Sequence, residues 1–373
     1  MKQVLRADLK KDLKHFIDFP HDLYKDDPNY VPELFIAQQD MLTPGKHPFH
    51  EHSTVDLFLA YDGGKVIGRV AAIMNNNHNK FNGTTDGFFG FFDCINDQET
   101  ANMLLDAAKA RIRELGATNM IGPASFSSND VLGYLIEGFD RPPVAMMPYN
   151  APYYNTLFEN YGLSKKIDLL AYEITIGEQN DKAFRMLDLL ETRLQRSGIT
   201  IRKINLKNFK EEAAKLRELY NTAWDKNLGF VPMTPAEFDY LAKDLKMILD
   251  ADYCQVAEKD GKFVGFGLAI PDINQILKTI KRGRLLPTGI FKLLLNKKKI
   301  NGLRVLCLGV NEGYRKLGIE ACIYGHFIKN SKKGNMKTAE CSWMLETNYV
   351  MNHAIEQLNG RLYKKYRVLE QAI

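Results

Sequence analysis

The feature that most constrains this chain is an order of strands and helices that occurs twice. In the second half, the apolar pattern and the turn residues predict these elements in order: strand 199–205, helix 207–224, helix 234–249, a two-stranded hairpin over 253–270, strand 303–310, helix 318–329, strand 337–345, helix 348–358 and strand 361–370. Asp260-Gly261 predicts the hairpin turn, and Thr234 followed by Pro235 predicts a helix start. Elements that alternate in this way predict an α/β fold with a mixed sheet.

The first half has the same order of elements. The predicted series is a hairpin over 56–73 with its turn at Gly63-Gly64, strand 86–95, helix 97–115, strand 119–124, helix 151–162 and strand 165–174. The pattern breaks at the polar segment 174–182, and a chain of 373 residues exceeds what one core usually organises. We therefore expect two domains, residues 1–176 and 177–373.

Composition excludes several classes of protein. With 45% hydrophobic and 25% charged residues, the chain is not disordered. Its five cysteines have no paired spacing, which argues against a disulfide framework or a zinc site, so we expect no metal and a reducing cytoplasm. The N-terminus lacks the apolar core of a signal peptide, and no stretch approaches the roughly 20 apolar residues of a spanning helix. We therefore expect any membrane contact to be peripheral.

The stretch "LGVNEGYRKLGIEACIY", residues 308–324, predicts a strand, a basic loop with a glycine, and a helix. Unpaired N–H groups and the positive end of the helix dipole would face an anion at Arg315-Lys316-Leu317-Gly318. The following helix would bury Ile319, Ile323 and Phe327 on one face. The alternative is an ordinary strand-to-helix turn with solvated basic side chains.

This order of elements resembles the GNAT acyltransferase superfamily, and "YRKLGIE" resembles its R-x-x-G-x-G/A signature for the pyrophosphate of acyl-CoA. The resemblance implies two tandem GNAT-like domains, of which the second binds acyl-CoA or an acyl-phosphopantetheine carrier. It assigns the following residues to the donor site: Leu308, Gly309, Val310, Arg315, Lys316, Leu317, Gly318, Ile319 and Asn352. Glu320 departs from the signature, because an anion stands where the family has Gly or Ala. The first half has Asp97 and Glu99 at the corresponding place, so we expect a degenerate copy there.

Transfer to an amine requires a base, a polarised carbonyl and a proton for the thiolate. A free aliphatic amine has a pKa of about 10.4, so it must be deprotonated. The Val310 N–H would polarise the carbonyl. Alternation along the strand predicts Glu340, Ser342 and Glu346 on one face, with the two glutamates as candidate bases. Glu340 could instead be paired with a lysine, and Glu346 could be an ordinary carboxylate at the strand end.

The helix after that strand adds two candidate catalytic residues, Asn348 and Tyr349. Asn348 could equally be only the N-cap. In the family this helix often carries a tyrosine that protonates the thiolate, but Ile355 stands at its position. The resemblance therefore implies that Tyr349, Tyr324 or water supplies the proton.

The insertion 272–302 points to the acceptor. Between residues 275 and 300 it carries eight Lys or Arg, no acid and many leucines and isoleucines, and Gly283 and Pro287 predict two short helices. Such a segment is typical of contact with an anionic membrane. The alternative is a helical hairpin with a solvated basic face. Nucleic-acid binding is not expected, because aromatic stacking residues are lacking.

Stretches along nearly the whole chain, among them "FPHDLYKDDPNYVPEL" and "GPASFSSNDVLGYL", resemble a bacterial family of long GNAT-like proteins that includes a ceramide synthase. The resemblance implies an N-acyltransferase that acts on a primary amine, such as a sphingoid or other lipid amine, at the inner membrane face. Candidate substrate-binding residues are Asn129, Asp130, Tyr149 and Ser342. Two alternatives are FemABX-like aminoacyl transfer to a cell-wall precursor and a non-catalytic GNAT-like binding protein.

Overall fold

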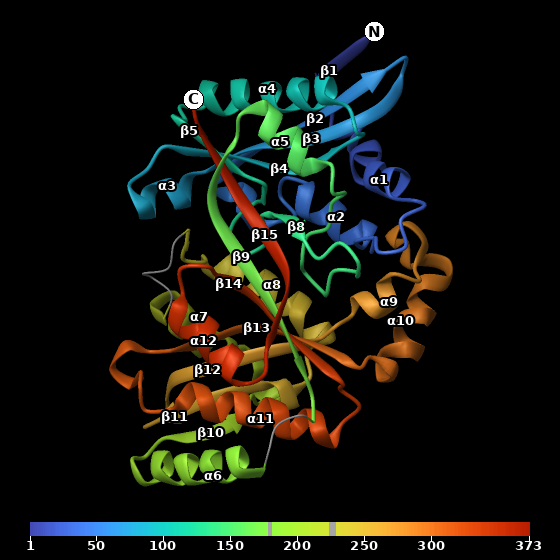
Figure 1. Ribbon diagram of the computed structural model, residues 1–373. Helices are drawn as coiled ribbons and strands as arrows, with labels where there is room; N and C mark the ends of the chain where they lie inside the picture. The colour runs from blue at the N-terminus through green and yellow to red at the C-terminus, as the bar shows by residue number, and fades with distance from the viewer. Residues whose placement is uncertain (178–180, 224–228) are drawn as a thin grey trace. The chain divides into compact units, whose positions relative to one another are not determined.

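The computed structural model describes residues 1–177, 181–223 and 229–373 (Figure 1). The chain divides into two compact units. Unit 1 comprises Met1–Leu170, Asn274–Lys297 and Lys364–Ile373, and unit 2 comprises Ala171–Ile273 and Lys298–Tyr363. The predicted domains 1–176 and 177–373 stay a prediction, because compactness alone does not define a domain. Residues 178–180 of the predicted break and Trp224 at the end of a predicted helix lie outside the described residues.

Unit 1 contains a mixed sheet. Its strands, in spatial order, are β1 (Lys2–Arg6), β2 (Ser53–Asp62), β3 (Lys65–Asn75), β4 (Asp86–Cys94), β5 (Asn119–Gly122) and the last part of β15 (Arg361–Ala372). Neighbouring strands are antiparallel, except for β4 and β5, which are parallel. β8 (Tyr134–Glu137) also pairs with β15, and β6 (Ala124–Ser125) pairs with β7 (Val131–Leu132) in a small separate sheet.

Helices cover both faces of the unit 1 sheet. On one face lies α4 (Gln98–Glu114), which approaches β3 so closely that a Cβ on Gly68 would be 2.6 Å from the Leu104 side chain. The next residue, Arg69, points to the other face and donates from its guanidinium to the Phe16 carbonyl oxygen of α1 (Leu13–Leu23). The remaining helices of the first 170 residues are α2 (Phe35–Leu42), α3 (Asn76–Asn82), α5 (Tyr154–Tyr161) and a 3-10 turn at Pro48–Glu51.

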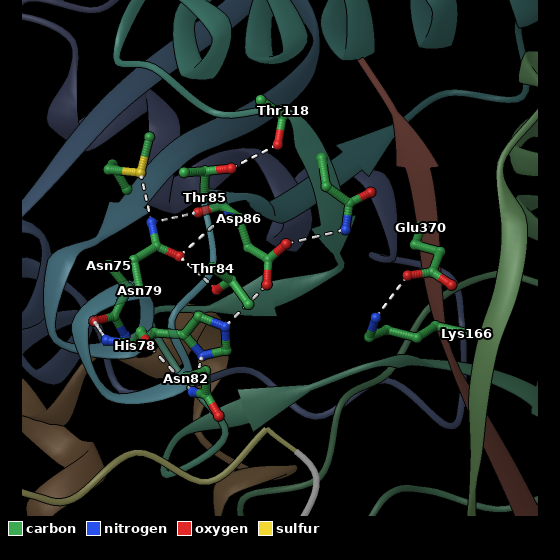
Figure 2. Close-up of polar contacts among 12 residues, drawn as sticks. Asn75, His78, Asn79, Asn82, Thr84, Thr85, Asp86, Thr118, Lys166 and Glu370 are labelled. Carbon is green, nitrogen blue, oxygen red and sulfur yellow. Dashed lines mark hydrogen bonds and ion pairs between the residues drawn. The ribbon is translucent and has the colours of Figure 1, made fainter.

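A polar cluster fixes the start of β4, as Figure 2 shows. His78 Nε2 lies 3.1 Å from Asp86 Oδ2, and Asn119 donates to Asp86 Oδ1 at 3.1 Å. Asn79 bonds both backbone groups of Asp86, at 2.9 and 3.0 Å. The bond from His78 is the main cause that lowers the pKa of Asp86. The cluster therefore ties α3 to the strands β4 and β5.

Unit 2 repeats the same order of elements. Its strands are β10 (Thr200–Lys203), β11 (Cys254–Lys259), β12 (Lys262–Pro271), β13 (Gly302–Val310) and β14 (Thr338–Leu345), next to the last part of β9 (Ser164–Thr175). Its helices are α6 (Asp181–Arg196), α7 (Phe209–Ala223), α8 (Pro235–Ile248), α11 (Ile319–Lys333) and α12 (Tyr349–Gln357). The predicted start of α8 is confirmed, because Thr234 and Glu237 form a capping box with Pro235 at the first helical position.

α11 lies directly on β12 in unit 2. A Cβ on Gly267 would be 2.5 Å from the Ile323 side chain, and one on Gly265 would be 3.0 Å from the Ile319 side chain. Ile319, Ile323 and Phe327 are all buried, which confirms the predicted apolar face of this helix. On another side α11 contacts α6, where His326 Nε2 lies 3.1 Å from Glu191 Oε1.

The insertion forms two short helices, as predicted. α9 (Asn274–Leu277) and α10 (Ile290–Asn296) are separated by a 3-10 turn at Lys281–Gly283 and a π-type turn at Leu285–Gly289. Another 3-10 turn, Lys297–Lys299, follows α10. Gly283 packs against the Glu33 carbonyl oxygen at a place where a Cβ would have no room. Among the described residues, no helix is both long enough and apolar enough to cross a bilayer.

Candidate active site

The candidate site in unit 2 begins where two parallel strands separate. β13 and β14 pair only from Gly302 to Val305 and from Thr338 to Cys341, although β13 continues to Val310 and β14 to Leu345. The register between β12 and β13 also shifts between Leu268 and Ala269. Beyond Val305, the residues of β13 up to Gly309 are half-buried. The ends of these strands therefore leave backbone groups that a ligand in extended conformation can pair with.

A basic loop connects β13 to α11. Lys316 and Gly318 both have left-handed backbone conformations, with φ of 66° and 91°. The loop leads directly into the first turn of α11, whose N–H groups favour an anion. Glycine is required at Gly318 for a second reason, because a Cβ would be 2.5 Å from the Leu190 side chain of α6. Arg315, Lys316 and Leu317 are exposed, and Arg315 Nε donates to the Val310 carbonyl oxygen at 3.2 Å.

Glu320 is half-buried in the first turn of α11. It is one turn before Tyr324, and its charge contributes to the raised pKa of that tyrosine. The carboxylate therefore lies on the side of the helix that carries Tyr324. The same carboxylate also complements the positive end of the helix dipole.

Tyr324 carries a buried hydroxyl that has no hydrogen-bond partner among the described residues. Burial is the main cause that raises its pKa well above the usual value, followed by the nearby thiols of Cys341 and Cys307. These thiols belong to β14 and β13, so the hydroxyl lies near the strands that separate. A buried hydroxyl without a partner costs free energy, on the order of 1–3 kcal/mol, and a bound ligand would remove that cost.

Asn352 is a second buried polar residue beside β14. Its Nδ2 donates to the Leu345 carbonyl oxygen at 3.1 Å, whereas its buried Oδ1 has no partner in the described part of the chain. Asn348 caps α12, because its side chain accepts from the Met351 N–H at 3.3 Å. The N-cap reading of Asn348 is thus confirmed, and the orientation of Asn352 leaves one acceptor unused.

Glu340 and Ser342 belong to a buried polar group. Arg304 on β13 is opposite Glu340 in the strand register, and its Nε donates to Ser342 Oγ at 3.1 Å. Tyr363 donates to Glu340 through a short hydrogen bond. Glu340, Ser342 and Arg304 are each at most 4% exposed. Tyr363 is therefore one partner of Glu340, and the pairing with a lysine stays a prediction. Sequence reasoning missed Arg304, although a cation within an apolar strand was a signal for it.

The other predicted catalytic residues lie further out. β14 ends at Leu345, so Glu346 follows the strand and is half-buried in the turn before α12. Tyr349 is 76% exposed at the first position of α12. Their catalytic roles stay predictions. Of the two tyrosines, only Tyr324 has its hydroxyl buried near β13 and β14.

Unit 1 has the same separation of parallel strands, but side chains occupy the strand end. β4 and β5 pair only over Asp86–Phe88 and Asn119–Ile121. At the end of β4, the Cys94 N–H donates to Tyr154 Oη at 3.0 Å, and Tyr153 Oη donates to the Cys94 carbonyl oxygen at 2.6 Å. Cys94 ends β4 as Val310 ends β13. The backbone groups that could bind a ligand at this strand end are thus already used.

A buried network holds these tyrosines. Tyr24 and Tyr154 each donate to Asp93 Oδ1 at 3.2 Å, and Arg69 Nε donates to Asp93 Oδ2 at 2.8 Å. Burial raises the pKa of Tyr154 well above its usual value, so the hydroxyl stays protonated. The predicted acidic residues at the next helix start, Asp97 and Glu99, both pair with Lys2, at 2.8 and 2.7 Å.

The predicted substrate-binding residues of unit 1 lie in two places. Ser127 Oγ accepts from the Asn129 N–H at 3.1 Å and donates to Asp130 Oδ2 at 2.8 Å, which forms a turn. Tyr149 donates to Asp27 Oδ2 at 2.5 Å and packs edge-on against Tyr24. The described residues contain no group of three or more His, Cys, Asp or Glu side chains that could hold a metal ion.

No protein-family model matches the chain. Two curated sequences match it over almost its whole length. Protein YghO of Escherichia coli K12 is 36% identical over 376 residues, which cover 98% of this chain and 94% of the relative. The bacterial ceramide synthase of Caulobacter vibrioides is 34% identical over 372 residues, which cover 97% of this chain and 95% of the relative.

Solved structures share the fold at low sequence identity. A tandem GNAT protein from the clavulanic acid biosynthesis pathway has a TM-score of 0.57 and 11% identity, with 100% of this chain and 98% of that one covered. A GCN5-related glucosamine N-acetyltransferase region of a fungal multi-domain β-N-acetylglucosaminidase also has a TM-score of 0.57, at 15% identity, and the match spans 38% of that longer protein. The fold is that of two tandem GNAT domains.

Proposed function

The chain belongs to the tandem GNAT-like N-acyltransferase family that includes the bacterial ceramide synthase, and from this membership we propose that unit 2 transfers an acyl group from acyl-CoA to a primary amine. The observation that carries the proposal is the separation of β13 and β14 beside the basic loop Arg315–Gly318. An acyl-carrier phosphopantetheine would present the same extended arm. FemABX-like transfer and non-catalytic binding are the outcomes that the experiments below would reveal.

The donor would lie along the open end of β13. Backbone groups of Leu308, Gly309 and Val310 would pair with the pantetheine arm, as a neighbouring strand would. The N–H groups at the start of α11, with Arg315 and Lys316, would receive the pyrophosphate. The unused acceptor of Asn352 would take a pantetheine amide N–H.

The reaction forms one C–N bond and breaks one C–S bond. The amine loses a proton, which finally resides on the departing thiol, so no oxidant, reductant or metal is required. Glu346 is the proposed base, acting directly or through water, because it follows β14 outside the buried group around Glu340. The Val310 N–H would bind the developing oxyanion.

Tyr324 is the proposed hydrogen-bond donor to the departing sulfur. Because its pKa is raised, the hydroxyl carries its proton at neutral pH and can donate. Tyr324→Phe should lower kcat by about 100-fold while the Kd for acyl-CoA changes little. Tyr349→Phe is the matched comparison, since that ring is exposed. Loss of activity in the Tyr349 variant alone would contradict the assignment.

The proposed acceptor is a lipid amine, such as a sphingoid base. Two observations support this choice: the name of the Caulobacter relative and the basic, leucine-rich insertion between β12 and β13. The acceptor, its acyl chain length and a peripheral position on the inner membrane face are parts of this proposal.

A direct test uses purified protein with palmitoyl-CoA and sphinganine. Mass spectrometry should detect the N-acyl product, with one thiol released for each amide formed. Acetyl-CoA and palmitoyl-CoA should each raise the Tm, because a ligand that binds only the folded state stabilises it. If neither donor changes the Tm, acyl-CoA is not the donor. If both raise the Tm without any amide product, the chain is a binding protein.

A further inference from the structure

The insertion presents an exposed apolar face. Phe291, Leu294 and Leu295 of α10 are 62%, 66% and 75% exposed, and Leu286 just before the helix is 78% exposed. The first three are spaced i, i+3 and i+4, so they share one side of the helix. Large side chains in such a cluster indicate a surface that meets an apolar partner. We call these four residues the insertion surface.

Two arginines of the insertion have structural partners. Arg284 donates to both carboxylate oxygens of Asp18, at 2.9 and 3.0 Å, and its guanidinium lies over the Phe35 ring. Arg282 donates to Asp22 Oδ1 at 2.5 Å. Both partners belong to α1, so these arginines hold the insertion against α1 within unit 1. They are not the cations that a membrane would meet first.

The lysines of the insertion are the cations that lie at its surface. Lys278, Lys281, Lys292 and Lys297 are exposed, and Lys298 and Lys299 follow α10 in the chain. Residues 275–300 contain no acidic residue, so the segment itself carries only positive charge. Lysines next to an exposed apolar helix face suit anionic head groups above an acyl boundary.

We propose that the insertion surface docks on an anionic phospholipid bilayer, with α10 lying in the plane of the interface. The proposal rests on the proposed function only for its purpose, which is access to a lipid amine. A second copy of this chain is a poorer partner, because a symmetric contact would place the same lysines opposite each other. The bilayer supplies both the apolar layer and the negative charge.

The test is flotation of the purified full chain with phosphatidylcholine vesicles, with and without phosphatidylglycerol. The wild type should float with the anionic vesicles, and added salt should reduce the bound fraction. Phe291→Ser/Leu294→Ser/Leu295→Ser should abolish flotation. Lys297→Glu/Lys298→Glu/Lys299→Glu should abolish it with anionic vesicles. Met186→Ser/Leu189→Ser, on the exposed side of α6, is the matched control and should float as the wild type does.

Each outcome decides the proposal separately from the acyl transfer. Equal flotation of the serine triple variant and the wild type, at equal Tm, would overturn it. A second set of results would also overturn it: the wild type does not float with either kind of vesicle and is a dimer by light scattering, whereas the serine triple variant is a monomer. The insertion surface would then be the contact between two copies of this chain. Transfer to a water-soluble short-chain amine should persist in both triple variants, so loss of docking and loss of catalysis are distinguishable.

Discussion

At the scale of single residues, we expect Glu320 to weaken phosphate binding at the proposed donor loop. Its carboxylate lies in the first turn of α11, beside the N–H groups that would bind the pyrophosphate. Glu320→Ala should therefore increase the affinity for acyl-CoA several-fold, by about 1 kcal/mol, as calorimetry would measure. The helix should lose about 0.5 kcal/mol of stability, because a favourable partner of its dipole is gone.

Glu356→Ala on α12 removes the same charge from an exposed position and should leave the affinity unchanged. Weaker binding in the Glu320 variant would mean that this carboxylate helps the donor to bind. The signature mismatch at Glu320 would then be an adaptation rather than an obstacle.

Asp86 makes the free energy of unfolding of unit 1 depend on pH in a direction that can be predicted. The His78 bond lowers the pKa of Asp86 below the ordinary 3.8, so this carboxylate stabilises the fold above that pH and loses its contribution as the pH falls through the lowered value. Asp86→Asn should cost about 1–2 kcal/mol near neutral pH. Urea unfolding should show the difference from wild type shrinking in acid. The exposed Asp140→Asn is the control, and a difference that grows in acid would refute the assignment.

At the scale of elements, the contact between α11 and β12 positions the donor loop. Gly267→Ala would place a methyl group 2.5 Å from the Ile323 side chain, so α11 would have to shift. We expect a loss of about 1–3 kcal/mol in urea unfolding, as is usual for overpacking. Gly313→Ala, which meets nothing within 4 Å, should be close to neutral. Equal losses in the two variants would point to backbone entropy instead of packing.

Elements defined by local signals were predictable from the sequence. Thr234 with Pro235, the Asp260-Gly261 turn and the apolar face of α11 depend on residues a few positions apart, and the structure confirms all three. α1 and α2 were not predicted from the sequence. α1 contains Pro20, a residue that argues against a helix in a sequence pattern, and α2 has only eight residues and no clear helical period.

The candidate site was less predictable, because its parts come from distant segments. The loop Arg315–Gly318 follows from the resemblance, but the burial of the Tyr324 hydroxyl depends on α11 packing beside Cys307 of β13 and Cys341 of β14, which are distant in the sequence. The use of Cys94 by Tyr153 and Tyr154 joins residues about sixty positions apart, which no local pattern reveals. Local residue propensities predict the helices and strands. Tertiary contacts decide whether the end of β4 or the end of β13 keeps backbone groups that a ligand can bind.

At the scale of the whole molecule, one fold occurs twice, and we propose a donor site in only one of the two copies. Both units separate a pair of parallel strands at the same place in their element order. In unit 1 the last residue of β4 is bonded by two tyrosines, and the acids at the next helix start are paired with Lys2. In unit 2 the corresponding helix start is preceded by Arg315 and Lys316. We therefore propose that unit 1 binds the acceptor or contacts the membrane instead of binding a donor.

Calorimetry with acyl-CoA should therefore give one site per chain. Arg315→Glu/Lys316→Glu should abolish the binding heat, because two cations beside the proposed pyrophosphate position become anions. Tyr153→Phe/Tyr154→Phe should keep one site with unchanged affinity, while the Tm falls, since both backbone groups of the buried Cys94 lose a tyrosine partner and Asp93 Oδ1 loses one of its two tyrosine donors. Two sites in the wild type, or binding heat that survives in the Arg315 variant and disappears in the tyrosine variant, would place the donor in unit 1.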